Sequence, residues 1–559
     1  PDRWWSYEGV DAIVLATSDE AFLDKLTSPQ IDAIAQWVRL GGRLILCVGA
    51  RGEKLLAEGG PWAALAPGKL ADVSPLRDGT GLETFTASKL PHGEERYERD
   101  RPLVSRLTDA SGTVLVEEGG AISANRPLIV HAPRGLGQVT YVGIDLDHPA
   151  LASWKGRPSL IARLLQGKEP REQSDREANR SVTHLGYEDL VGQLRAALDQ
   201  VPTVKIVNFT TVSILTIVYL LLIGPGDFLL LSRLGWPRQV TWFTFPLVAI
   251  ALGAVAWLFG SQSHGEKVRL NQAELVDIDA SSGVARGTVW AHLYSPATDH
   301  FDLQMQIEPP PTSSPGNAAQ PQGWLAWQGL PGESMGGLAS RQVSLAAADP
   351  YSISLPRPQP TMENLPVQVA SSKSLSGRWW AQVDVQAKNQ LAENQYGVVT
   401  GTFEQPLPFE LTDCLLIHGE KLYRLGKLPA GHTVHMDDFA PLNLEARLTE
   451  RTVVLSKDVS TPWRKDLVDV PRILLMMMFH EAARGSSFTG LTNRYQPYVD
   501  LTEQVRLGRA VLVGRTEKGA CQIHRGDRPL ADPSAVQTWT WYRVILPVGK
   551  EQPEQPTNP

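Results

Sequence analysis

The sequence predicts a multidomain protein in which a membrane hairpin of two helices separates an N-terminal α/β domain from a C-terminal domain rich in β-sandwich structure. Three observations predict this architecture. Strand and helix patterns alternate in residues 8–50, two long uncharged runs occupy 206–223 and 240–260, and short strand-like segments recur from there to about residue 548. A chain of 559 residues is also too long for one hydrophobic core.

The domain boundaries follow changes in composition. They are expected at 1–165 for the α/β domain, 166–203 for a charged linker with an amphipathic helix, 204–260 for the hairpin, 261–548 for the β-rich domain and 549–559 for a disordered tail. The chain starts at Pro1 without an initiator Met, and a strand pattern follows almost at once. We therefore expect the α/β domain to be truncated, with a signal sequence or a further helix lost upstream.

Composition and charge exclude several classes of protein. The net charge of -7 and the pI of about 6.0 argue against a nucleic-acid-binding protein, which needs a basic face. Cys47, Cys414 and Cys521 are too few and too scattered for a disulfide framework or a zinc site. His432 and His435 would point to opposite sides of a strand. We expect no metal and no cofactor.

The first domain begins with a strand, a helix and a second strand. The strands are expected at 11–16 and 43–48, and the helix starts with Ser28 as its cap and Pro29 as its first helical residue. This order makes a parallel, right-handed unit. A strand pair and a closing helix are expected further on, at 127–131, 138–144 and 158–165.

The patterns at Leu26–Gln30 and Trp37–Leu44 resemble those of flavodoxin-like, glutamine amidotransferase-like domains. The similarity covers about residues 8–165 and is to the degenerate members found in bacterial membrane proteins. It implies an α/β fold in which a cysteine follows a strand, within the pattern G-x-C-x-G, and works with a downstream His-x-Glu.

Two residues match that catalytic pattern in part. Cys47 ends the corresponding strand, and His148 follows about a hundred residues later. Ile45 replaces the first elbow glycine, however, and Ala150 replaces the carboxylate that orients the histidine. A Cys47–His148 dyad is one hypothesis, and a buried cysteine near a surface histidine is the other.

The two uncharged runs predict a transmembrane hairpin. The 18 residues of 206–223 span about 27 Å as a helix, close to the hydrocarbon thickness of a bilayer, and 240–260 is longer. Buried core helices of a soluble protein are the alternative. Arg233 and Arg238 lie in the short loop without an acid, so the loop is expected in the cytoplasm and both domains outside it.

One motif lies at membrane depth, Gly224-Pro225-Gly226-Asp227. Asp227 is the only acid there, and no residue of the second helix is an evident partner for it. The functional interpretation is an ion or proton relay. The structural one is a kink at Gly224 and Pro225 that lets Asp227 reach headgroups or water.

The β-rich domain is expected to be preceded by a helix and to contain many short strands. Residues 188–200 predict an amphipathic helix that lies on the membrane surface or packs on the first domain, and its mixed charges favour packing. The expected strands are 287–294, 301–307, 379–385, 398–403, 414–418 and 453–455, with one helix at 471–483.

A second resemblance covers about residues 8–548. It is to a family of uncharacterised conserved membrane proteins of planctomycete-type bacteria, and it rests on the segments 186–190, 193–200, 222–228, 491–495, 500–502 and 508–515. It implies a cell-envelope protein with no assigned reaction, and together with the hairpin we expect a multi-pass protein of the bacterial inner membrane. Asn493, Arg494 and Tyr495 are candidate binding residues, because Arg and Tyr often anchor interfaces. A capped turn is the alternative explanation.

Three functional hypotheses remain. The first is a non-catalytic envelope scaffold that contacts the lipid bilayer and other envelope proteins, and no nucleic acid. The second is a membrane-tethered amidotransferase-like hydrolase that uses Cys47 and His148. The third is a transporter accessory subunit in which Asp227 matters. The first is favoured because the catalytic pattern fails at two positions.

Overall fold

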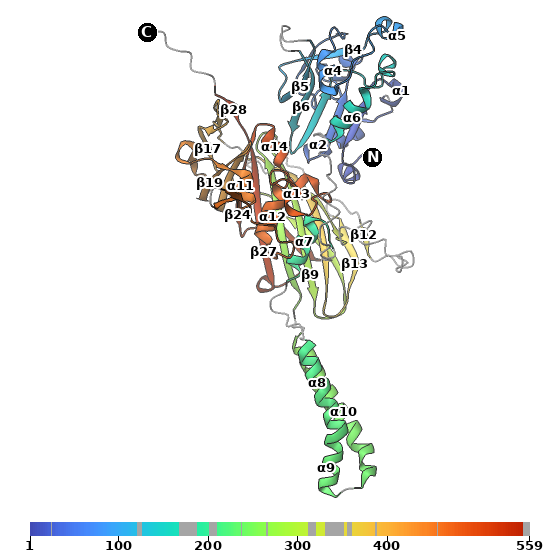
Figure 1. Cartoon of the computed structure of the whole chain (residues 1–559), viewed down its shortest axis with the longest axis vertical. Coiled ribbons are helices and arrows are strands. Elements are labelled where there is room, and N and C mark those ends of the chain that lie inside the picture. The colour runs from blue at the N-terminus through green and yellow to red at the C-terminus, as the bar shows by residue number, and fades with distance from the viewer. Residues whose placement is uncertain are drawn as a thin grey trace.

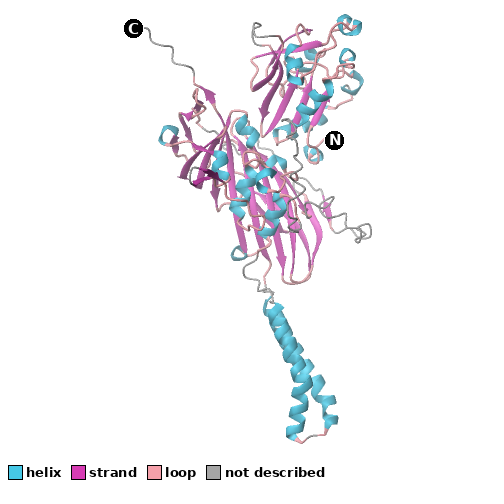
Figure 2. Ribbon diagram, viewed as in Figure 1, coloured by secondary structure: helices cyan, strands magenta, loops and turns pink. Residues whose placement is uncertain are grey.

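The computed structural model describes residues 1–551 except 24, 120–125, 167–186, 201–208, 236, 264–266, 311–319, 330–350, 355–359, 386–387 and 455–456. It has three parts (Figure 1). An α/β domain lies at one end, a large β-rich domain lies in the middle, and a helical hairpin projects from the other end (Figure 2). The predicted mixed architecture with a β-rich C-terminal region is confirmed. The linker predicted at 166–180 lies outside the described residues, apart from Gln166, which ends α6.

The N-terminal domain is built on a five-stranded sheet in the order β1-β2-β7-β6-β5. The first three strands are parallel, and β6 and β5 are antiparallel additions. The strands are β1 (Ile13–Ala16), β2 (Arg43–Cys47), β5 (Thr113–Glu117), β6 (Pro127–Arg134) and β7 (Gly137–Val142). The remaining elements are α1 (Glu20–Leu23), α2 (Ser28–Arg39), α3 (Gly52–Leu56), β3 (Lys69–Pro75), α4 (Thr80–Thr86), α5 (Glu95–Arg99), β4 (Leu103–Thr108) and α6 (Arg157–Gln166).

The predicted strands and helices of this domain are confirmed, with one correction at a helix start. Thr27, not Ser28, caps α2, and it forms a capping box with Gln30. The Thr27 backbone N–H donates to Gln30 Oε1 at 3.0 Å. Thr27 is the cap because the glutamine three residues later accepts a hydrogen bond from the Thr27 N–H. Ser28 has no such acceptor three residues after it.

The β-rich domain contains a nine-stranded and a five-stranded sheet that share one core. The larger sheet has the order β11-β14-β9-β8-β27-β24-β18-β19-β21, and the smaller one β12-β13-β10-β25-β26. The strands of the larger sheet are β8 (Arg269–Asp279), β9 (Val284–Ser295), β11 (Gln322–Trp327), β14 (Ser371–Gln382), β18 (Leu411–His418), β19 (Lys421–Leu428), β21 (Leu442–Asn443), β24 (Arg509–Thr516) and β27 (Val536–Pro547). Those of the smaller are β10 (Asp299–Ile307), β12 (Ser352–Ser354), β13 (Thr361–Val367), β25 (Cys521–Arg525) and β26 (Arg528–Pro529).

Helices cover the other face of the nine-stranded sheet and form a second core with it. They are α7 (Leu190–Leu198), α11 (Leu444–Leu448), α12 (Val470–Met478), α13 (Ser486–Thr489) and α14 (Thr502–Arg506). The predicted helix at 188–200 is therefore present as α7, but it packs on the β-rich domain and not on the first domain. Its apolar face, with Leu190 and Leu194 fully buried, finds its partner in α12 and in β8 and β9.

Short strands complete the domain. They are β15 (Ala392–Glu393), β16 (Val399–Thr400), β17 (Thr402–Glu404), β20 (Thr433–His435), β22 (Thr452–Val454), β23 (Lys457–Val459) and β28 (Gly549–Lys550). β28 pairs in parallel with β15, so the first two residues of the expected tail at 549–559 are ordered in a strand. Residues from 552 onward lie outside the described part of the chain.

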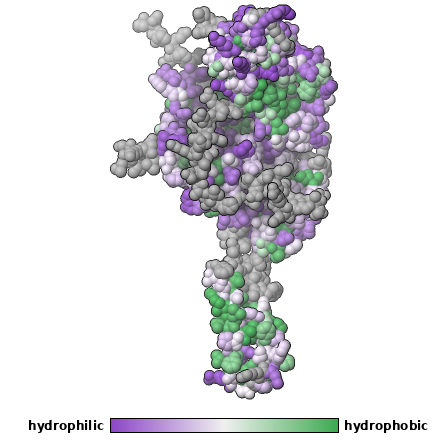
Figure 3. Space-filling view, turned by 45° about the vertical axis from the view of Figure 1, so that its right-hand side comes forward, coloured by the Kyte–Doolittle hydropathy of each residue, from purple (hydrophilic) through white to green (hydrophobic). Residues whose placement is uncertain are grey.

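The hairpin comprises α8 (Phe209–Leu221), a π-helical turn at Leu222–Gly226, α9 (Asp227–Leu234) and α10 (Thr241–Ser263). One helix, Val212–Leu234, is long and apolar enough to cross a membrane. The apolar stretch of α10 is shorter, Thr241–Val255, among the side chains that are described. Apolar side chains cover the outside of the hairpin (Figure 3), with Trp242 83% exposed. A surface of this kind needs an apolar environment.

Candidate functional site

Cys47 lies at the carboxyl end of β2, at the position where the amidotransferase-like pattern predicts a nucleophile. Its side chain is completely buried. Burial, reinforced by Asp145 and Asp147, raises the pKa of the thiol to about 12. A cysteine nucleophile needs the opposite shift, because the thiolate is the reactive form.

The loop after β2 is occupied by a side chain of the protein itself. The Asp145 carboxylate accepts hydrogen bonds from the backbone N–H groups of Gly49 at 3.1 Å and Ala50 at 3.0 Å, and from Thr17 Oγ1 at 3.4 Å. Paired backbone N–H groups at such a turn are the donors that stabilise an oxyanion in acyl transfer. Here they bind an internal carboxylate.

His148 is engaged elsewhere. Its Nδ1 accepts a hydrogen bond from the Ala150 N–H at 3.2 Å, and its Nε2 lies 3.8 Å from Asp100 Oδ2. Among the described residues, no hydrogen bond joins His148 to Cys47. The Cys47–His148 dyad stays a hypothesis, and the geometry does not favour it.

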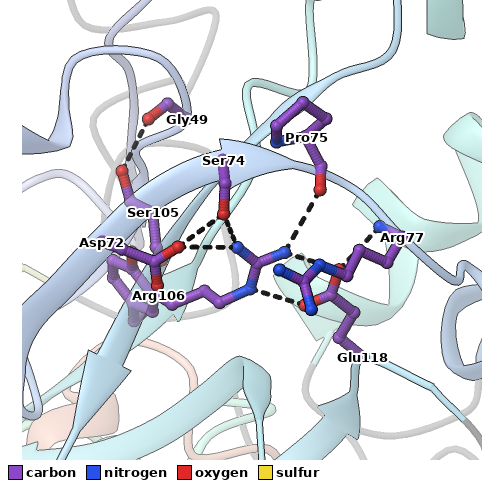
Figure 4. Close-up of polar contacts among 9 residues, drawn as sticks. Gly49, Asp72, Ser74, Pro75, Arg77, Ser105, Arg106 and Glu118 are labelled. Carbon is purple, nitrogen blue, oxygen red and sulfur yellow. Dashed lines mark hydrogen bonds and ion pairs between the residues drawn. The ribbon is translucent and has the colours of Figure 1, made fainter.

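A charged cluster around Arg106 lies near the same edge (Figure 4). Arg106 Nε and Nη2 donate to the two oxygens of Glu118 at 2.7 and 2.8 Å, and Nη1 reaches Asp72 at 3.0 Å. Burial raises the pKa of Glu118, but the bonds from Arg106 and from the Arg77 N–H outweigh it, so the net shift is downward. The cluster fastens the β3–β4 hairpin to the end of β5.

The candidate binding residues 493–495 lie beside a set of hydrogen bonds that joins two distant segments of the chain. Asp189 caps α7 by accepting from the Val191 N–H at 3.0 Å, and it also accepts from Thr492 Oγ1 at 2.6 Å and from the Arg494 N–H at 2.8 Å. Two segments about 300 residues apart, both used for the second resemblance, therefore meet.

The three side chains of this tripeptide differ in exposure. Asn493 donates to the Met477 carbonyl at 3.1 Å, whereas Arg494 is exposed and Tyr495 is half exposed. The hydrogen bond from the Arg494 N–H to Asp189 thus gives part of this sequence pattern a structural role. The exposed Arg494 and Tyr495 remain candidate contacts for a partner.

Asp227 has a partner in the second helix, contrary to the sequence-based expectation. Thr244 Oγ1 donates to Asp227 Oδ1 at 2.6 Å, and Asp227 is buried between α9 and α10. The partner was missed because a threonine carries no charge to signal pairing. Pro225 sits in the π-helical turn, which lets the helix continue through Gly224 and Gly226.

A further set of polar contacts between distant segments lies at the interdomain interface. We define this interface by Glu8, Leu40 and the turn 135–137 of the N-terminal domain, and by Arg286, Arg378, Gln504 and Arg509 of the β-rich domain. Arg286 Nη1 donates to the Leu40 carbonyl at 2.5 Å. This carbonyl belongs to the C-terminal end of α2, where the helix dipole favours a cation.

The turn between β6 and β7 supplies the second set of interdomain bonds. Arg509 Nη1 donates to the Gly135 carbonyl at 2.6 Å, and Gln504 Nε2 donates to the carbonyls of Leu136 and Gly137 at 3.0 and 3.2 Å. The Leu136 side chain is buried in the helix-side core of the β-rich domain. The turn therefore inserts the Leu136 side chain into the β-rich domain and also binds that domain through its carbonyl groups.

Aromatic and ionic contacts close the interface. Arg378 pairs with Glu8 at 2.5 Å and lies 3.8 Å from the centre of the Tyr498 ring. Burial raises the pKa of Glu8, and Arg378 opposes that shift. Cation–π stacking and the ion pair together fix the N-terminal segment against β14.

A buried ion cluster supports Arg286 from below. The Asp277 carboxylate on β8 accepts from Arg286 Nε at 3.0 Å, from Arg543 Nε at 2.6 Å and from Arg543 Nη2 at 2.9 Å. Burial raises the pKa of Asp277, but Arg543 and Arg286 outweigh it, so the net shift is downward. Sequence reasoning missed this cluster. The signal was present as Asp277 and Asp279, two acids at alternate positions at the end of β8.

Comparisons with known proteins add little to this geometry. A family model described as a domain of unknown function (DUF8725) matches residues 386–506. No curated protein matches the sequence. Within the described ranges, no group of three or more His, Cys, Asp or Glu side chains is arranged to hold a metal ion.

Similar solved structures were also found. An exo-β-1,4-mannosidase from Opitutaceae bacterium strain TAV5 is 18% identical with a TM-score of 0.19, over 29% of this chain and 25% of the mannosidase. The yeast δ-COP-I μ-homology domain is 8% identical with a TM-score of 0.18 when complexed with a Dsl1 WxWxV peptide, and 7% identical with a TM-score of 0.19 in a second structure. Both of these alignments span 50% of this chain and 96% of the yeast domain. TM-scores this low do not establish a shared fold.

Proposed function

We propose that the protein is a non-catalytic scaffold of the bacterial inner membrane, anchored by a two-helix hairpin, whose soluble domains bind other envelope proteins on the extracytoplasmic side. The observation that carries the proposal is the interdomain interface. Its bonds from Arg286 and Arg509 require both domains to lie on the same side of the bilayer. A single crossing between the domains would place them on opposite sides.

An even number of crossings therefore supports a second span in α10. Its 23 residues reach about 34 Å, enough for the hydrocarbon core. Arg233, in the last turn of α9 next to the connecting loop, favours a cytoplasmic hairpin tip. The raised pKa of Cys47 weighs against the hydrolase alternative, and the closed Asp227–Thr244 bond gives no support to a transport role.

Single-cysteine labelling in intact cells tests the arrangement. The three native cysteines are buried, so they contribute little background. Ser153, Ser232 and Ser534 are exposed, and each is replaced by cysteine in turn. We expect an impermeant maleimide to label S153C and S534C in intact cells, and S232C only after permeabilisation. Labelling of only one of S153C and S534C contradicts a hairpin, and labelling of S232C alone contradicts the extracytoplasmic placement.

A further inference from the structure

A cleft of about 490 Å³ opens on the β-rich domain, where β18, β19, β24 and β27 meet α11 and α12. Its volume lies within the range of small-molecule sites. Four arginines line it, and none of them is among the residues of the interdomain interface: Arg424, Arg447, Arg472 and Arg515. Nothing in the proposed scaffold role uses these residues.

The acidic residues that line the cleft are already committed to partners. Asp413 pairs with Arg515 at 3.0 Å, and Glu450 pairs with Arg472 at 2.7 Å. Asp469 caps α12 by accepting from the Arg472 N–H at 3.1 Å. The carboxylates therefore neutralise two of the four arginines and one helix end.

Arg424 and Arg447 keep their charge available. Both are exposed, and among the described residues neither guanidinium has a hydrogen bond or an ion pair. Arg424 projects from the middle of β19, and Arg447 from the last turn of α11. A guanidinium presents several donors in one plane, which suits carboxylate and phosphate oxygens.

Trp541 also lines the cleft. Trp541 on β27 is 4% exposed, and its indole Nε1 is buried without a hydrogen-bond partner. Arg515 lies over the Trp541 ring, 5.5 Å from its centre, which keeps the indole in place. Because Nε1 has almost no accessible surface, the ring contributes an apolar surface to the cleft.

We propose that this cleft binds a small anionic ligand whose carboxylate or phosphate group contacts Arg424 and Arg447. Apolar side chains of Leu475 and Met476 provide a wall for the rest of the molecule. The matched family segment 386–506 supplies both free arginines, whereas Arg515 and Trp541 come from strands beyond it.

Titration of the full chain in detergent with inorganic phosphate and with succinate tests the proposal, at ionic strength balanced with chloride. We expect saturable binding of at least one of them, weakened by about tenfold or more in the R424Q/R447Q variant. The preferred anion tells the carboxylate from the phosphate source.

The control is Arg528→Gln, which removes one exposed positive charge on β26, outside the cleft. It should leave binding unchanged. Thermal unfolding checks that each variant folds, and the single variants R424Q and R447Q replace the double one if it does not. Equal affinity in wild type and R424Q/R447Q, an equal loss in R528Q, or no saturable binding of either anion at millimolar concentration overturns the proposal.

Discussion

The two faces of the nine-stranded sheet treat buried acids in opposite ways. Glu274 and Asp277 lie on the same strand, β8, and both are fully buried. Since they are three residues apart, their side chains point to opposite faces. Glu274 faces the core shared with the smaller sheet, where burial raises its pKa to about 7. Asp277 faces the helices and the interdomain interface, and the net shift of its pKa is downward.

The difference lies in the partners and not in the degree of burial. Glu274 receives hydrogen bonds from the Ala520 N–H at 2.9 Å and from Trp379 Nε1 at 3.3 Å, and none from a cationic side chain in the described part of the chain. Asp277 receives two guanidinium groups. The Glu274 face is therefore an apolar core that disfavours charge. The Asp277 face carries the buried cluster of Asp277, Arg286 and Arg543, which we call the ionic platform, and Arg286 also donates to the N-terminal domain.

The largest effect is expected from breaking the ionic platform. Asp277→Asn leaves Arg286 and Arg543 buried without a counter-charge, which costs about 3–5 kcal/mol. We expect the midpoint of thermal unfolding of the β-rich domain to fall by about 10 °C. Calorimetry of the full chain in detergent measures this shift.

Asp299→Asn provides the matched control. Asp299 pairs with Arg525 at 2.7 Å, but both side chains are about half exposed. Such a surface pair is worth less than about 1 kcal/mol. A similar shift in both variants would mean that the cluster at Asp277 has no special role.

The buried Glu274 makes the free energy of unfolding depend on pH. The pKa of Glu274 is raised from 4.5 to about 7 in the folded state, so the folded state binds a proton that the unfolded state releases. Stability is therefore fully present below about pH 4.5 and falls as pH rises toward 7, by about 3 kcal/mol in total. Glu274→Gln should flatten this part of the curve of unfolding midpoint against pH.

An exposed acid serves as the comparison for that measurement. Glu410 is exposed and pairs with Lys427 at 2.9 Å. Glu410→Gln should keep the wild-type pH dependence. If Glu274→Gln also keeps it, the slope arises elsewhere and the contrast between the two faces is wrong.

Much of the N-terminal fold could be predicted from the sequence, because local patterns determine it. Short apolar runs predict β1 and β2, and an amphipathic pattern that ends at glycine predicts α2. The glycines at 135 and 137 predict the β6–β7 turn. The partners of these elements could not be predicted in the same way. The turn's carbonyls bind Gln504 and Arg509, about 370 residues away, and no local pattern encodes that pairing.

The candidate sites show the same limit. The sequence placed Cys47 at the end of the correct strand, but only the structure shows that Asp145 fills the loop beside it. The cleft arginines were missed for a related reason. Arg424, Arg447, Arg472 and Arg515 come from separate elements and share no spacing, so a scan for motifs has nothing to detect.

The smallest of these effects concerns the contact between the ionic platform and α2. Gly41 has a φ of +121°, and a Cβ there would overlap the Arg286 guanidinium. Gly41→Ala should therefore strain the backbone and displace Arg286 from the Leu40 carbonyl, at a cost of about 1–3 kcal/mol. Gly59→Ala separates the two contributions, because Gly59 also has a positive φ of +83° but a Cβ there meets nothing within 4 Å. A lower unfolding midpoint and easier separation of the domains in small-angle scattering, in G41A and not in G59A, would assign the difference to Arg286. Equal behaviour of the two variants would assign it to backbone strain alone, and the interface would then owe its stability to the 135–137 turn.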